Sequence, residues 1–184
     1  MTTTSIITEQ NAYKILIVID TATIKKKHFN DDSDTKEPLK IEKANWFAIC
    51  QTKETNNSAD EVYIDRKKYN KIIISGISID GNSSDAIILN QIKNHKSGKK
   101  TILKFEAVCM SKKTISNDQN NPDELAVLKA EQNFIWFESL IYNLRNSKIK
   151  IQFSQYYLNS DGNQQDFYGS FWFPLEINLY LGND

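Results

Sequence analysis

The 184-residue chain has few of the residue types that build disulfide or zinc folds. It contains two cysteines, Cys50 and Cys109, which are too few for the disulfide framework of a small secreted domain. Both lie in apolar sequence, so we interpret them as free core thiols. The two histidines, His28 and His95, lie among lysines rather than near other ligand-forming side chains. A zinc site is therefore not expected.

Long hydrophobic runs are also missing. The longest aliphatic run spans residues 15–19, whereas a membrane-spanning helix requires about 20 apolar residues. The first ten residues lack the basic start and apolar stretch of a signal peptide. These features predict a cytoplasmic protein with no membrane span. The length favours one domain over residues 1–184, with residues 1–12 as a flexible tail.

An excess of charge of either sign is absent as well. Lysine plus arginine and aspartate plus glutamate number 23 each, so the formal net charge is zero. Nucleic-acid-binding proteins usually carry a basic excess on one face, so a nucleic-acid partner is not expected. A chain without net charge also lacks the repulsion that keeps protein molecules apart. The charge balance thus permits self-association.

The residues that are present favour β-strands. Short β-branched and aromatic segments recur along the chain, and they are separated by turn-forming residues. Residues 148–154 alternate strictly between polar and apolar, as in a strand with one face on the core. The last strand should direct Ile177, Leu179 and Leu181 inward and Glu176, Asn178 and Tyr180 outward. The segments expected to form strands are residues 15–19, 46–50, 62–64, 72–74, 87–89, 102–108, 148–154 and 171–181.

Two Asp-Gly-Asn sequences, at residues 80–82 and 161–163, supply the positive φ angles that hairpin turns require. The second turn should make the strand through Phe153 pair antiparallel with the strand around Phe171. A helix is predicted from Asn121 to about Gln132, because Asn-Pro-Asp-Glu is a typical helix start. The chain as a whole is expected to form an all-β, antiparallel, jelly-roll-like β-sandwich with one or two short helices.

The sequence motifs typical of catalytic and metal-binding sites are incomplete in this chain. The acidic cluster Asp31, Asp32 and Asp34 invites a calcium site, but the glycine of an EF-hand loop is missing, so a solvated loop is favoured. Residues 76–80 differ from a nucleophile elbow because Asp80 replaces the second glycine, which makes Ser78 an ordinary strand residue. Residues 98–101 lack the first glycine of a phosphate-binding loop. We therefore predict no catalytic residues, no enzyme activity and no cofactor.

Aromatic residues are the remaining candidates for a ligand or interaction surface. Tyr156 and Tyr157 are neighbours on one strand, so one of them must face outward, and Tyr180 is also expected outside. Trp46 and Trp172 are further candidates, although a core position is favoured for each tryptophan.

Three segments resemble the PixA/AidA family of bacterial inclusion-body proteins. Residues 15–21 (ILIVIDT) resemble the opening strand of that family, and residues 46–51 (WFAICQ) lie where it has a second hydrophobic strand. Residues 168–177 (YGSFWFPLEI) resemble its closing signature, although Phe173 stands where the family usually has aspartate. The middle segment lacks an expected Arg-Trp pair, and the chain is not methionine-rich. The chain thus resembles a divergent member, over about residues 15–181.

The resemblance implies a non-enzymatic protein that accumulates in the bacterial cytoplasm, where its partner is itself, as a homo-oligomer or inclusion. A storage, stress or host-association role would fit. The alternative is a carbohydrate-binding module or lectin, whose partners would be glycans. In that alternative, calcium could be held by the acidic loop at residues 31–34.

Overall fold

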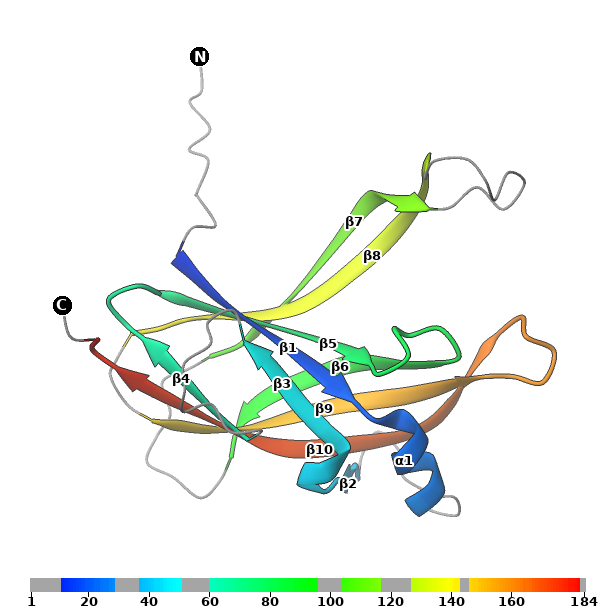
Figure 1. The fold of residues 1–184 in the computed structure, drawn as a ribbon, viewed down its shortest axis with the longest axis horizontal. Helices are drawn as coiled ribbons and strands as arrows, with labels where there is room; N and C mark the ends of the chain where they lie inside the picture. Colours follow the sequence, from blue (N-terminus) through cyan, green and yellow to red (C-terminus); the bar gives the residue numbers. More distant parts are fainter. Residues whose placement is uncertain are drawn as a thin grey trace.

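The computed structural model describes residues 11–28, 37–50, 60–95, 104–116, 127–142 and 146–182. These residues form two β-sheets that enclose a shared hydrophobic core (Figure 1). A short helix, α1 (Thr21–Lys27), and a 3-10 helix, η2 (Lys43–Asn45), complete the described structure. The predicted all-β sandwich with one or two short helices is confirmed.

The first sheet has five strands in the order β3-β1-β5-β8-β7. Its strands are β1 (Ala12–Ile19), β3 (Trp46–Cys50), β5 (Lys71–Ser78), β7 (Glu106–Ser116) and β8 (Val127–Leu140). β1 pairs parallel with β5, while the other neighbours pair antiparallel. The first sheet is therefore mixed rather than purely antiparallel.

The second sheet is built around the hairpin of β9 (Ser147–Leu158) and β10 (Gln165–Tyr180). β6 (Asp85–Asn94) pairs antiparallel with β9. On its other edge, β10 pairs in parallel with β2 (Leu39–Lys40) and with β4 (Glu61–Asp65). This sheet is also mixed, because β2 and β4 run in the same direction as β10.

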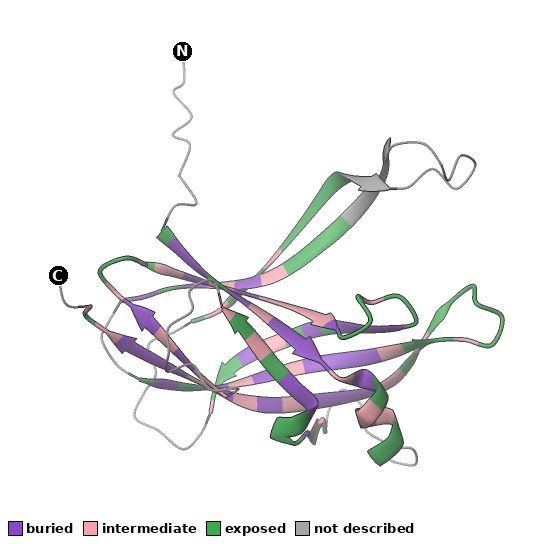
Figure 2. Ribbon diagram, in the orientation of Figure 1, coloured by how far each residue is buried: buried purple, intermediate pink, exposed green. Residues whose placement is uncertain are grey.

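Alternating apolar residues of the two sheets form the core. Ile149, Ile151 and Phe153 of β9 are fully buried, as their alternation predicts. Alternating residues of β10 in the same sheet and of β1 in the other sheet are buried as well, and the buried stretches of both sheets are purple in Figure 2. The sheets come close at Gly76, where an added Cβ would lie 2.8 Å from the Leu89 side chain. Only glycine lets β5 and β6 approach this closely.

The strand predictions were most accurate where alternation or a buried run was strong. The prediction for residues 46–50 coincides with β3, and residues 15–19 lie within β1. β9 and β10 pair antiparallel with Phe171 opposite Phe153, as the Asp161–Gly162 turn predicted. Gly162 has the expected positive φ of 70°.

The helix predicted at residues 121–132 is wrong over the part that is described. β8 begins at Val127 and continues through Gln132, paired antiparallel with β7. A cap-like start and a few helix-forming residues were the only local signal, and cross-strand pairing overrides such local preference. Residues 121–126 lie outside the described residues.

Several smaller expectations also need correction. Ala12 begins β1 and is buried, so the strand starts within the segment expected to be a flexible tail. β10 ends at Tyr180, so Leu181 is 53% exposed, while Asn178 is buried rather than outward. Gly81 and Asn82 have the expected positive φ, but their turn joins β5 to β6 of the other sheet rather than closing a hairpin.

Candidate functional site

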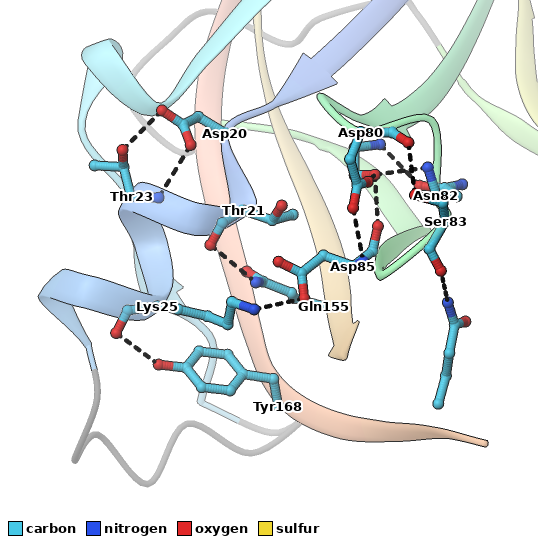
Figure 3. A network of polar contacts seen from close by, with 12 residues as sticks. Asp20, Thr21, Thr23, Lys25, Asp80, Asn82, Ser83, Asp85, Gln155 and Tyr168 are labelled. Atoms are coloured by element: carbon cyan, nitrogen blue, oxygen red, sulfur yellow. Dashed lines mark hydrogen bonds and ion pairs between the residues drawn. The ribbon is translucent and has the colours of Figure 1, made fainter. Parts of the chain in front are cut away.

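Helix α1 follows β1 directly and begins at Asp20, whose carboxylate caps its first turn. Asp20 accepts hydrogen bonds from the Thr23 backbone N–H at 3.0 Å and from the Thr23 hydroxyl at 2.7 Å. Ile24 is buried, and the helix ends in three lysines, which suit the negative end of a helix. A bond from the Gln155 amide to the Thr21 carbonyl, 3.1 Å long, fastens the helix start to β9 (Figure 3). No helix was predicted at these residues.

Tyr168 holds the other end of α1. The pairing of β9 with β10 shifts register between Phe167 and Gly169, so Tyr168 is the extra residue of a β-bulge. A bulge re-aims its side chain away from the regular strand face. The Tyr168 hydroxyl lies 3.1 Å from the Lys25 carbonyl and 3.0 Å from the His28 carbonyl. Its proton is thus shared between two carbonyls at the C-terminal end of the helix.

A cavity of about 580 Å³ lies between α1 and the ends of β9 and β10. It is lined by Ala22, Lys25, Lys26, Tyr157 and Tyr168. The two tyrosine rings meet edge to face, with centroids 6.3 Å apart. The cavity therefore offers aromatic walls beside two lysine side chains.

The polar turn between β5 and β6 lies beside α1 and this cavity. Lys25 forms an ion pair with Asp85, with a 2.6 Å distance between Nζ and Oδ1 (Figure 3). The Ser78 hydroxyl contacts the Asp80 carboxylate and lies 2.6 Å from the Asp85 carbonyl oxygen. Burial tends to raise the pKa of Asp80, but hydrogen bonds from the Ser78 hydroxyl and three backbone N–H groups outweigh it and lower the pKa. Ser78 and Asp80 thus stabilise the β5–β6 turn.

The five aromatic candidates do not form one site. Trp46 is buried and stacks on Phe173 with centroids 4.2 Å apart, so only the edge of its ring is open, toward a cavity that Lys43 and Pro174 also line. Tyr157, 36% exposed, is the only one of the five that lines the cavity beside α1. Tyr156 packs edge to face with Phe167, and Tyr180 is half-buried at the end of β10.

Trp172 lies at the surface among cations. Its ring is half-buried, with Lys150 Nζ 4.3 Å and Lys40 Nζ 5.6 Å from the ring centroid. The His95 ring lies 5.9 Å away. These contacts occupy part of the face that a sugar would stack on.

Asp31, Asp32 and Asp34, which were considered as calcium ligands although a solvated loop was favoured, lie outside the described residues. Within the described ranges, no three His, Cys, Asp or Glu side chains are grouped to hold a metal ion. In the same ranges, no helix is long and apolar enough to cross a membrane.

A surface that the sequence did not predict is the hairpin of β7 and β8, which projects from the sandwich (Figure 1). β5 pairs with β8 only through residues 137–140. Beyond this point, the two strands have each other as their only strand partners among the described residues. We call residues 108–113 of β7 and 133–136 of β8, which lie beyond this point, the β7–β8 arm.

Both faces of the β7–β8 arm expose apolar side chains, and most of the arm is coloured as exposed in Figure 2. Met110 lies opposite Phe134 on one face, and Cys109 lies opposite Ile135 on the other. Met110, Phe134 and Ile135 are 40%, 41% and 43% exposed. Cys109 is also exposed, contrary to the expectation of a core thiol, because it lies beyond the edge of the sandwich. A two-stranded ribbon of this kind is at best marginally stable alone in water.

The family model PixA, described as inclusion body protein, matches residues 11–179. A crystal structure of an inclusion body protein of the PixA family from Burkholderia cenocepacia J2315 has a similar fold, with a TM-score of 0.74. The two chains are 20% identical, and the match covers 92% of this chain and 96% of the other. No curated protein matches the chain.

Proposed function

The chain belongs to the PixA family of inclusion body proteins, and on this premise we propose that it is a non-enzymatic protein that self-associates into cytoplasmic inclusions. Such inclusions would serve storage, stress or association with a host. The observation that carries the proposal is the β7–β8 arm, whose two faces both expose apolar side chains. A projecting ribbon of this kind gains stability when another surface covers it.

The charge balance supports the same proposal. With 23 cationic and 23 anionic side chains, the molecule has no long-range repulsion against copies of itself. Whether many copies pack densely then depends mainly on the shape complementarity of their surfaces.

Electron microscopy of cells that express the chain tests this proposal. We expect dense inclusions with the natural sequence and fewer or none with Phe134→Ser combined with Ile135→Ser. Both side chains are more than 40% exposed, so the variant should keep its melting temperature within a few degrees. Leu181→Ser, at an exposed position outside the arm, is the matched control and should form inclusions normally. A natural-sequence protein that stays monomeric at high concentration would refute the proposal.

A second candidate function is glycan binding, which the cavity beside α1 favours. Tyr157 and Tyr168 provide aromatic walls, and Lys25 and Lys26 provide donors, which are the groups that recognise sugar rings and hydroxyls. A glycan array should then show selective binding that Tyr157→Ala abolishes. The array is run with and without calcium, because the lectin alternative includes a calcium ion. An array without any signal would rule this candidate out.

A further inference from the structure

Among the described residues, the outer edge of β7 has no strand partner. β7 is the last strand in the order of the first sheet, and its described pairing is with β8 alone. An edge strand presents a row of backbone N–H and C=O groups that can pair with another chain. Natural proteins protect such edges with proline, bulges, short strands or charged side chains, above all lysine. The stretch 106–113 contains no proline and keeps a regular register with β8.

The charges along this edge are complementary to themselves. Glu106 and Lys112 are both exposed, carry opposite charges and point to the same face of β7, because their numbers differ by an even count. In an antiparallel pair of identical strands, a two-fold axis at Cys109 places Glu106 of each copy opposite Lys112 of the other. The same axis places Val108 opposite Met110, and Cys109 opposite its own counterpart.

Neighbouring registers lack this match. An axis at Val108 would place Glu106 opposite Met110 and would bring Lys104, which precedes β7, toward Lys112, so that two like charges come near each other. An axis at Met110 would leave Glu106 opposite Thr114 and Lys112 opposite Val108. In the free chain Glu106 contacts Lys104 at 3.0 Å, but both side chains are well exposed, so this pair contributes little and can exchange for Lys112.

We propose that β7 pairs antiparallel with β7 of a second copy of this chain, about a two-fold axis at Cys109. The inference rests on the proposed self-association and assigns it a surface. Each dimer contains two Glu106–Lys112 pairs and two Val108–Met110 pairs, and it joins the first sheets of two molecules into one. The exposed ribbon then becomes part of a wider sheet, which supplies the stability that a lone hairpin lacks.

Thiol cross-linking tests the register. The Cα atoms of directly opposed residues in antiparallel strands lie about 4.5–5.5 Å apart, which is within the range of a disulfide. Mild oxidation of the purified chain should therefore give a covalent dimer through the exposed Cys109. Cys50→Ser should keep this dimer and Cys109→Ser should lose it. Cys50 is half-buried, and burial raises its pKa, so it reacts slowly.

Charge reversal tests the contacts independently of the thiol. Either Lys112→Glu or Glu106→Lys should weaken dimerisation about tenfold in sedimentation experiments, since the symmetry applies each charge change twice. The double variant Glu106→Lys with Lys112→Glu should restore it, because the two charges simply change places. Lys113→Glu is the matched control: it makes the same charge change at the next exposed residue, on the other face, and should leave dimerisation unchanged.

The outcomes separate the two proposals. If the chain self-associates but Cys109 does not cross-link and the double charge swap fails to rescue, the β7 interface is wrong while the inclusion function stands. If the chain is monomeric under all conditions, both proposals fail.

Discussion

The buried carboxylate of Asp65 connects β4 to the residues after β10 through hydrogen bonds. Asp65 is the last residue of β4 and is 2% exposed. Its Oδ1 accepts hydrogen bonds from the backbone N–H of Gly182 at 3.0 Å and of Lys67 at 2.9 Å, and Lys68 Nζ lies 3.5 Å from Oδ2. The Gly182 hydrogen bond contributes most to lowering the pKa of Asp65 below 3.8, against the opposing effect of burial.

This lowered pKa predicts a pH-dependent contribution to stability. The carboxylate favours the folded state while it is ionised, so its contribution is full above about pH 4 and is lost as the pH falls through the folded-state pKa. Asp65→Asn should therefore destabilise the protein most at neutral pH, and the difference from the natural sequence should shrink in acid. Urea unfolding between neutral pH and about pH 3 measures this.

Asp161→Asn removes the same charge from the exposed turn between β9 and β10 and controls for net charge. A difference between Asp65→Asn and the natural sequence that stays constant with pH would contradict the assignment.

At the scale of elements, predictability followed the strength of the side-chain pattern. β9 and β10 could be predicted because their alternation directs Ile151, Phe153, Phe171 and Phe173 to one face, and a positive-φ turn fixes their order. β8 could not, because its residues 133–137 contain apolar side chains for both faces. Only its pairing with β7 shows that it is a strand. α1 is a seven-residue helix whose one clear local signal is the cap at Asp20.

The candidate surface residues also differ in whether the sequence pattern predicted them. Tyr156 and Tyr157 were both named as candidates from the sequence, because two adjacent strand residues must face opposite sides, and the structure places Tyr157 at the cavity. Tyr168 was not named, since its direction depends on a bulge that regular alternation does not reveal. The β7–β8 arm was also missed. Its projection arises because only four residues of β5 pair with the much longer β8, and this comes from tertiary structure rather than local sequence.

At the scale of the whole molecule, a well-packed sandwich carries an apolar arm and has no net charge. The sequence pI is 6.7, so the protein is least charged close to neutral pH. Opposite charges are interspersed along the chain, and they form exposed pairs such as Lys27–Glu42 and Lys43–Asp60. Association is therefore governed by local contacts near neutral pH and by net repulsion away from it.

Solubility should accordingly have its minimum near pH 6.7 and increase toward pH 5. Below its pI the protein carries a net positive charge, so copies of it repel one another at pH 5. Asp65 stays ionised at that pH because its pKa is lowered, so its carboxylate still stabilises the fold while the repulsion between copies increases. Turbidity across this range measures the effect, with circular dichroism as the control for folding. Added salt should screen the repulsion and reduce the gain, whereas unchanged solubility between pH 6.7 and 5 would contradict the role of net charge.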